Sequence, residues 1–334
     1  MKVLILTDGK AGHENQSKAF ARALGCDFDL MPVQFRSKTA KAFSYLLDKL
    51  GIRTEKLFST AGDVPSSDHG YAAVTGTGSG TFYAAKVLAR RLGVKCGVVL
   101  YPRGYATGSF DCILAPAFDR PPPAANVVEV PANLVAADPA YYADGVAAFK
   151  RHYRDTVGHD FDMARSAVAV IIGGPNKCST MTPEWMRMQL DSVFAAHKAD
   201  GENIPELWVT TSRRTPPDVE KVVASYPWDY RLLYSKDHFN PIPAFVSLAQ
   251  TMYVTAESTG MLSEVCTFGS AEVHALDNLK PGRHKFRRFL EDLVHGGYVE
   301  GIKKIDLSAQ FARARSLLGI ASSSATHAGS GGTC

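Results

Sequence analysis

The sequence predicts an α/β protein made of two Rossmann-like domains, each built around a parallel β-sheet. Short unbroken apolar runs, such as residues 3–6 and 168–172, are typical of strands that are buried on both faces. Several of these runs end in a glycine-rich turn that leads directly into a helical pattern, and this order recurs in both halves of the chain. A length of 334 residues suits about two domains, and 46% apolar residues are ample for two cores.

Composition narrows the class of protein. A net charge of +4 is too small to indicate nucleic-acid binding, and it suits an anionic ligand or an anionic membrane face. The six cysteines form no C-x-x-C pair, which predicts reduced, buried thiols and neither a disulfide framework nor a zinc site. The sequence starts with Met-Lys and a strand, without a signal-peptide pattern, and no apolar run reaches the ~18 residues of a membrane span. We therefore expect a cytoplasmic protein, with a peripheral position at the inner membrane left open.

The first domain is predicted over residues 1–155. A strand at 3–6 is followed by a loop at 8–16 and a helix at 16–23, which Gly25 stops. The dinucleotide fingerprint G-x-G-x-x-G is absent from this loop. The later elements alternate in the same way. They are a helix at 40–50, a strand at 72–74 with a glycine-rich turn at 75–80, a helix at 82–92, strands at 98–101, 111–115 and 127–130, and a helix at 139–155.

The second domain is predicted over residues 166–305, after a polar linker at 157–165. Thr182 and Pro183 are typical of a helix cap and a first helical residue, and Pro217 opens a second helix in the same way. The predicted strands lie at 168–172, 207–210, 230–233, 252–254 and 273–276. A separate C-terminal helix is expected at 306–321, and a disordered Ser/Gly-rich tail at 322–334.

Three strand-end loops of the second domain, 173–177, 211–215 and 255–260, are polar and small. The carboxyl ends of parallel strands lie on one edge of a sheet, so these loops are predicted to meet there. Lys177, Arg213, Arg214 and the helix start at 258–260 can then surround one diphosphate, and Glu264 can accept hydrogen bonds from ribose hydroxyls. The alternative is structural: a capped helix and solvated cations.

Four segments together resemble the signature segments of the mitochondrial fission ELM1-like family. They are residues 8–16 (DGKAGHENQ), 173–177 (GGPNK), 210–216 (TTSRRTP) and 255–264 (TAESTGMLSE). The resemblance also covers residues 285–289 (KFRRF) and runs from about residue 1 to 305, although Gly260 stands where the family pattern has a serine. Bacterial members have carried the name of nucleoside-diphosphate-sugar epimerases, and the family in turn resembles the GT-B glycosyltransferases.

The resemblance implies two domains that face each other across a cleft. The second would hold a nucleotide-diphosphate sugar, as co-substrate without any other cofactor, and the first an unknown acceptor. The residues expected to bind the nucleotide sugar are small, hydroxyl-bearing, basic or acidic. They are Gly12, Gly173, Gly174, Asn176, Lys177, Thr211, Ser212, Arg213, Arg214, Thr255, Glu257, Ser258, Thr259, Gly260, Ser263 and Glu264.

Transfer at an anomeric carbon needs a base that activates the acceptor hydroxyl. Candidate bases are His13, Glu14 and Asp8, and histidine is favoured because its ordinary pKa lies near neutral pH. The structural alternative for His13 is a loop residue that caps the following helix. For this transfer we expect no metal ion.

These inferences favour a glycosyltransferase of cell-envelope or other glycoconjugate synthesis, with no nucleic-acid partner. Two alternatives stay open: a nucleotide-sugar hydrolase or epimerase, and a non-catalytic scaffold, since the family name refers to a plant organelle phenotype and not to a reaction. The basic run at 280–288 is interpreted as a solvated helix face, with contact to an anionic membrane as the alternative.

Overall fold

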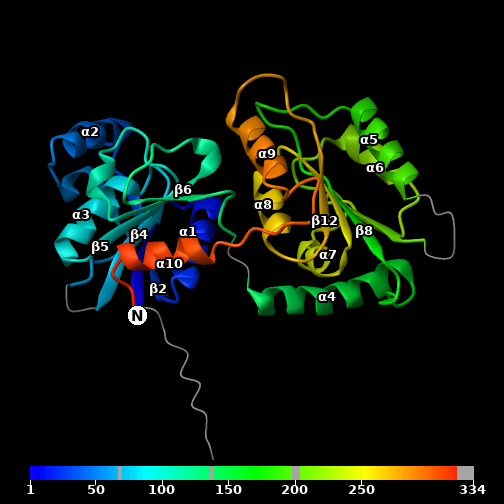
Figure 1. The fold of residues 1–334 in the computed structure, drawn as a ribbon, viewed down its shortest axis with the longest axis horizontal. Helices are drawn as coiled ribbons and strands as arrows, with labels where there is room; N and C mark the ends of the chain where they lie inside the picture. The colour runs from blue at the N-terminus through cyan, green and yellow to red at the C-terminus, as the bar shows by residue number, and fades with distance from the viewer. Residues whose placement is uncertain (67–69, 136–137, 198–203, 322–334) are drawn as a thin grey trace, which may run out of the picture. The chain divides into compact units, whose positions relative to one another are not determined.

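The computed structural model describes residues 1–66, 70–135, 138–197 and 204–321, and these form two compact units (Figure 1). Unit 1 consists of Met1–Pro116, Pro121–Val130 and the described part of Leu307–Cys334. Unit 2 consists of Ala117–Arg120 and Pro131–Asp306. The predicted tail at 322–334 lies outside the described residues.

Unit 1 contains a seven-stranded sheet in the order β3-β2-β1-β4-β5-β6-β7. Its strands are β1 (Lys2–Thr7), β2 (Asp27–Phe35), β3 (Phe58–Thr60), β4 (Tyr71–Thr77), β5 (Lys95–Val99), β6 (Cys112–Pro116) and β7 (Val127–Val130). All neighbours are parallel except β3, which pairs antiparallel with β2. The strand order reverses between β1 and β4, and such a switch point is where open α/β sheets bind ligands.

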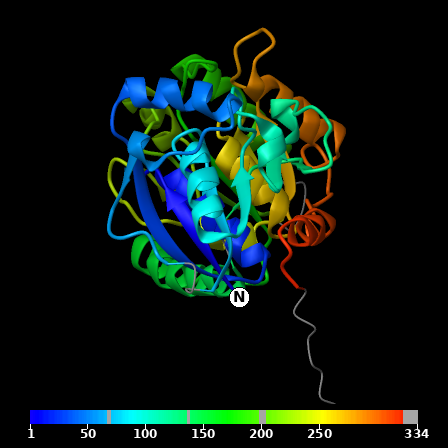
Figure 2. The same cartoon turned by 90° about the vertical axis from the view of Figure 1, so that its left-hand side faces the viewer.

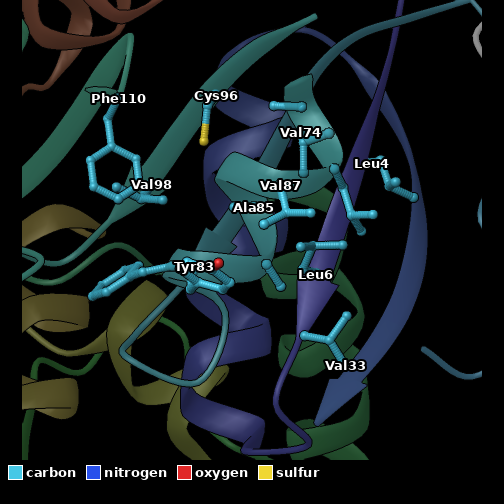
Figure 3. Close-up of a cluster of buried hydrophobic side chains, with 14 of the residues drawn as sticks. Leu4, Leu6, Val33, Val74, Tyr83, Ala85, Val87, Cys96, Val98 and Phe110 are labelled. Carbon is cyan, nitrogen blue, oxygen red and sulfur yellow. The ribbon is translucent and has the colours of Figure 1, made fainter. Parts of the chain in front are cut away.

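Helices cover both faces of this sheet. They are α1 (Ala11–Ala23), α2 (Lys38–Lys49), α3 (Phe82–Leu92) and α10 (Ser308–Leu317), with short 3-10 turns η1 (Glu55–Leu57) and η3 (Thr107–Ser109). Leu4, Leu6 and Val74 pack with Tyr83 and Val87 of α3 (Figure 3). The cyan helix in Figure 2 is α3. On the opposite face, a Cβ at Gly97 would touch Leu318 and Phe20, so α1 and the segment of α10 pack there without room for a side chain on β5.

Unit 2 contains a five-stranded, fully parallel sheet in the order β10-β9-β8-β11-β12. Its strands are β8 (Ala167–Ile171), β9 (Glu206–Thr210), β10 (Tyr230–Leu232), β11 (Thr251–Thr255) and β12 (Glu272–Leu276). Its helices are α4 (Pro139–Val157), α5 (Pro183–Ala196), α6 (Pro217–Ala224), α7 (Ile242–Leu248), α8 (Thr259–Thr267) and α9 (Lys285–His295), with the 3-10 turn η4 (Ala117–Asp119). The order of strands reverses between β8 and β11.

Both faces of this sheet are also buried. Met186, Leu190 and Val219 of α5 and α6 pack against Val170 and Val209 on one face. The other face carries an aromatic cluster, in which Phe149 and Tyr153 of α4 contact Trp208, Tyr230 and Phe245. The predicted cap of α5 is confirmed, because Oγ1 of Thr182 accepts from N–H of Trp185 at 3.2 Å.

The predicted α/β class with two Rossmann-like units is confirmed, with three differences in detail. The helix α4 belongs to unit 2 and not to the first domain, because its aromatic side chains complete the core of unit 2. The helix α10 belongs to unit 1 and is not a separate element. Strands β2 and β3 were not predicted, since the sequence of β2 holds Asp27, Asp29 and Pro32 instead of an apolar run. The arrangement of the units across a cleft stays a prediction.

Candidate functional site

The segment after β1 brings two of the predicted catalytic residues together in unit 1. It is not a loop up to residue 16, because α1 begins at Ala11 and the N–H groups of His13 and Glu14 both donate to the carbonyl of Lys10. Nδ1 of His13 lies 3.1 Å from both carboxylate oxygens of Asp8. Nζ of Lys10 donates to Asp8 at 2.7 Å. Burial raises the pKa of Asp8, but the hydrogen bond from Lys10 and the charges of His13 and Lys10 outweigh it, so this pKa lies below its usual value.

The glycine-rich turn after β4 makes room for this pair. A Cβ at Gly78, whose φ is +82°, would collide with the imidazole of His13. A Cβ at Gly80 would lie 2.7 Å from the Cβ of Asp8. The two side chains therefore pack directly on backbone at the switch point between β1 and β4. A side-chain exposure of 25% leaves His13 within reach of a substrate.

Glu14, the third candidate base, has other partners. It forms an ion pair with Lys18 at 2.7 Å and accepts from Oγ1 of Thr7 at 3.2 Å. The hydrogen bond from Lys18 is the largest influence on its pKa, which is lowered. A carboxylate held in its ionised form by a cation is a weaker base, so Glu14 is a poorer candidate than His13. Gly12, in the first turn of α1, is exposed, and a Cβ there would meet nothing within 4 Å.

At the switch point of unit 2, a buried carboxylate ties the strand ends together. Glu257 is 2% exposed, and its Oε1 accepts from N–H of Gly174 at 2.8 Å and from the hydroxyl of Thr255 at 3.1 Å. Its Oε2 accepts from the side-chain amide of Asn278 at 2.7 Å. The hydroxyl of Thr255 in turn accepts from N–H of Gly173 at 2.9 Å. The N–H groups of both glycines are thus already bonded within the protein, and a diphosphate would need other donors.

A cavity of about 350 Å³ opens beside these strand ends. Six of the predicted residues line it: Gly173, Thr211, Ser212, Arg213, Arg214 and Ser258. Both arginine side chains are exposed, and among the described residues no carboxylate forms an ion pair with either. The loop 211–215 is fixed in turn by Thr215, whose hydroxyl donates to the carbonyl of Gly173 at 2.6 Å and accepts from N–H of Ser212 at 2.9 Å.

The remaining predicted binding residues do not line this cavity. Lys177 is exposed, and Asn176 uses its Oδ1 to accept from N–H of Cys178 at 2.8 Å. Gly174 packs against the backbone of Arg214. Thr259 and Gly260 begin α8. Ser263 is buried, and its hydroxyl donates to the carbonyl of Thr259 at 2.6 Å. The predicted convergence thus includes both arginines and Ser258, but not Lys177.

Glu264 lies one turn after Met261, which lines the cavity, and is itself only 8% exposed. The hydroxyl of Tyr142 on α4 donates to its Oε1 at 3.3 Å. Burial raises the pKa of Glu264 to about 6, although the hydrogen bond from Tyr142 acts in the opposite direction. Burial therefore disfavours the ionised form of this carboxyl group.

Sequence reasoning missed one wall of the cavity, which is formed by the loop between β10 and α7 and by the first residue of α7. Its residues there are Tyr234, His238, Phe239, Asn240, Pro241 and Ile242. The available signal was topological: β10 is parallel to β9, so its carboxyl end lies on the same edge of the sheet. In unit 1, sequence reasoning noted the turn at 75–80 but did not connect it with His13 and Asp8.

Other expectations concern metals, thiols and membranes. Within the described ranges, no group of three His, Cys, Asp or Glu side chains could hold a metal ion, and no helix is long and apolar enough to span a membrane. Five cysteines are free thiols, four of them buried, while Cys334 lies outside the described residues. Two cations of the basic run at 280–288 bind within unit 2, because Arg287 pairs with Asp277 and Arg288 donates to the carbonyl of Phe118.

Comparisons with known proteins identify the family to which the chain belongs. No curated protein matches the sequence. Among solved structures, the chain is similar to the UDP-GlcNAc 2-epimerase from Neisseria meningitidis, with 11% identity, a TM-score of 0.49, and coverage of 95% of this chain and 97% of that one. It is also similar to a glycosyl transferase of family 9 from Veillonella parvula, with 10% identity, a TM-score of 0.38, and coverage of 96% and 98%. For a UDP-glucosyltransferase from Polygonum tinctorium, the values are 12% identity, a TM-score of 0.43, and coverage of 95% and 92%.

None of these three TM-scores reaches 0.5, so the similarities support no assignment of activity. The sequence pattern of the family described as "Mitochondrial fission ELM1" matches residues 11–316. That range contains the segments around His13, Gly173, Arg213 and Ser258, and the chain belongs to the mitochondrial fission ELM1 family.

Proposed function

We propose that the protein is a glycosyltransferase that uses a nucleotide-diphosphate sugar, in cell-envelope or other glycoconjugate synthesis. The observation that carries this proposal is the cavity of about 350 Å³ at the carboxyl ends of β8 and β9 in unit 2. Ligands of open α/β sheets bind at this edge, and the volume is that of a small-molecule site. Arg213 and Arg214 supply guanidinium groups, which match phosphate oxygens in geometry and charge.

The lining of the cavity separates into two parts that suit a nucleotide. Phe239, Pro241 and Ile242 form an apolar part that fits the flat face of a base. Arg213, Arg214 and Ser258 form a polar part, next to the first turn of α8, where the positive end of the helix dipole favours a diphosphate. Because the N–H groups of Gly173 and Gly174 are bonded to side chains, the arginines are assigned most of the diphosphate binding.

The pair of His13 and Asp8 is assigned the role of the base. When Nδ1–H of His13 donates to Asp8, its Nε2 keeps a lone pair and can take a proton. In the proposed reaction, the acceptor oxygen forms a bond to the anomeric carbon while the bond from that carbon to the diphosphate breaks. The acceptor proton goes to His13, and the two arginines stabilise the charge of the leaving diphosphate. Transfer without a metal ion is part of this proposal.

Calorimetric titration with UDP, GDP, ADP and their sugars tests the donor site. At least one nucleotide should bind, and Arg213→Ala should weaken its binding by about 1.5–3 kcal/mol, the usual worth of a hydrogen bond to a charged group. Arg187→Ala is the matched control, because Arg187 is an exposed arginine of α5 outside the cavity lining. If no nucleotide binds, or if both variants lose the same affinity, the proposal fails.

Product analysis separates transfer from the alternatives. The same base could take a proton from water, so release of free sugar without an acceptor would indicate a hydrolase. An epimerised nucleotide sugar would indicate an epimerase. Nucleotide binding without any product would favour the scaffold.

A further inference from the structure

Unit 1 contains a cavity of about 730 Å³ that the proposed donor site does not use. It lies where β1 and β2 end, and it is closed by β3 and by the start of α2. Lys10, Arg36, Lys38 and Lys41 are its cationic lining residues, and Asp8 is its only lining carboxylate. Asp8 is already paired with Lys10, at 2.7 Å, so three cations remain for a ligand.

These three cations have little to bind within the protein. Among the described residues, no carboxylate forms an ion pair with Arg36, Lys38 or Lys41. Nζ of Lys41 donates to the hydroxyl of Ser79 at 2.9 Å, which fixes the lysine beside the turn that supports His13 and Asp8. Arg36 and Lys38 are exposed, whereas Lys41 is half-buried in the wall of the cavity. A half-buried cation without a carboxylate partner points to a ligand of opposite charge.

The start of α2 gives a second reason to expect an anionic ligand. Lys38 and Lys41 lie among its first four residues, and no acidic residue lies in the first turn. Cations there are opposed by the positive end of the helix dipole, so they cost stability. Side chains that break such a local rule are expected mainly at functional sites. The hydroxyl of Ser37 already accepts from N–H of Ala40 at 3.0 Å, so the helix itself is capped. An anion held between the two lysines would remove this conflict by its charge.

We propose that this cavity binds a phosphate group carried by the acceptor, which defines the acceptor as a phosphate or diphosphate ester. The acceptor role rests on the proposed glycosyl transfer, whereas the phosphate site itself does not. Asp8 connects the two, because it lines the cavity and also contacts Nδ1 of His13. A phosphate seated among the cations would therefore place the rest of the acceptor next to the base.

A phosphate ester can be soluble or part of a lipid. The outer face of α2 and the residues after it expose four large apolar side chains: Phe43 at 57%, Leu46 at 53%, Leu50 at 64% and Ile52 at 46%. Phe43, Leu46 and Leu50 are spaced by three and four residues and so share one face of the helix. This surface begins close to the cationic cavity, and a lipid-borne phosphate could use both.

Titration with inorganic pyrophosphate tests the site. Lys41→Gln and Arg36→Gln should each raise the dissociation constant about 10-fold or more, because each removes a charged hydrogen-bond donor. Lys49→Gln, at the other end of the same helix and outside the cavity, should leave it unchanged. Absence of binding, or an equal effect of all three variants, would overturn the inference.

Two further experiments show in which unit the anion binds and whether it is soluble or part of a lipid. Arg213→Gln should remove only pyrophosphate bound in the donor cavity and leave the binding that Lys41→Gln removes. If Arg213→Gln abolishes all binding while Lys41→Gln has no effect, the anion lies in unit 2, and the inference fails while the donor site stands. If none of UDP, GDP, ADP and their sugars binds but pyrophosphate binding depends on Lys41, the proposed function fails and the phosphate site stands. Sedimentation with phosphatidic acid vesicles that Lys41→Gln and Phe43→Ser both reduce supports a lipid-borne phosphate, and pyrophosphate binding without sedimentation supports a soluble one.

Discussion

At both switch points a glycine makes room for a polar side chain, but the two units differ in what that side chain binds. In unit 1, Gly78 and Gly80 make room for His13 and Asp8, and the imidazole remains partly accessible. In unit 2, a Cβ at Gly173 would collide with Glu257, whose carboxylate is 2% exposed and bonded to Gly174, Thr255 and Asn278. The switch point of unit 1 thus holds a partly accessible imidazole, and that of unit 2 holds an internal support.

This difference depends on how many internal hydrogen-bond partners the side chain finds. Glu257 has a partner for each oxygen, so it stabilises the strand ends and has little left for a ligand. His13 has Asp8 at Nδ1, while its Nε2 has no hydrogen-bond partner among the described residues. A polar residue at a strand end therefore indicates function only after its internal partners have been counted.

The largest expected effect tests the chemical side of the comparison. His13→Gln should lower turnover by about 10²–10⁴-fold, the usual contribution of a general base, while nucleotide affinity stays the same. Steady-state rates and nucleotide titration on the same preparation measure both quantities. An equal loss of affinity would move His13 from catalysis to binding, and an unchanged rate would remove the distinction between the two switch points.

The structural side is tested by Glu257→Ala. The variant leaves the N–H of Gly174 and the amide of Asn278 without their buried acceptor, and each such group costs about 1–3 kcal/mol. We expect a loss of about 3 kcal/mol in the free energy of unfolding of unit 2, measured with urea. Glu291→Ala, an exposed position on α9, is the control. A stable variant that has lost nucleotide affinity would instead assign Glu257 to the ligand.

Glu264 sharpens the comparison, because it is a buried carboxyl group of unit 2 with a poor partner. Its pKa of about 6 lies above the ordinary 4.5, so the folded state holds the proton more tightly than the unfolded state. Its contribution to stability is therefore fully present below pH 4.5 and is lost as the pH rises to about 6. Glu264→Gln should raise unfolding free energy by about 2 kcal/mol at pH 7.5 and have no effect at pH 4.

Urea unfolding of the wild type and of Glu264→Gln across this pH range checks the predicted direction of the change in stability. Equal profiles would show that Glu264 is not held at a raised pKa. A more stable variant with weaker nucleotide binding would indicate that the wild type retains the charge for a ligand at the expense of stability.

Gly78→Ala makes a smaller perturbation at the other switch point. Alanine at a φ of +82° costs about 1–2 kcal/mol, and its Cβ would displace the ring of His13. We expect a modest loss of thermal stability together with a clear loss of turnover. Gly93→Ala, also at positive φ but with open space around its Cβ, is the matched control for strain alone. Equal effects of both variants on turnover would show that the position of His13 does not matter.

The smallest effect is expected for Glu14→Gln. The ion pair with Lys18 is spaced by four residues on α1, and such pairs contribute about 0.2–0.5 kcal/mol. Turnover should stay near that of the wild type. A loss comparable to that of His13→Gln would exchange the roles of the two residues.

The sequence predicted most strands and helices, because both sheets are buried on two faces and their strands appear as apolar runs. It failed at β2, where polar residues and Pro32 interrupt that pattern on a strand near the sheet edge. For the site, the rule that strand ends share an edge correctly grouped Arg213, Arg214 and Ser258. The rule could not show that internal hydrogen bonds occupy both oxygens of Glu257, or that Lys177 lies outside the cavity lining. These facts depend on side-chain packing between distant segments.

The helix α10 follows unit 2 in the sequence but packs in unit 1, and this affects how the chain folds during synthesis. Leu318, just after this helix, packs at Gly97 on β5, and Ala314 is fully buried. The ribosome completes all of unit 2 before this segment is made. At about 5–20 residues per second, unit 1 waits roughly 10–40 s with part of one sheet face uncovered. A chaperone that shields nascent chains would therefore be needed more by the first-made half than by the second.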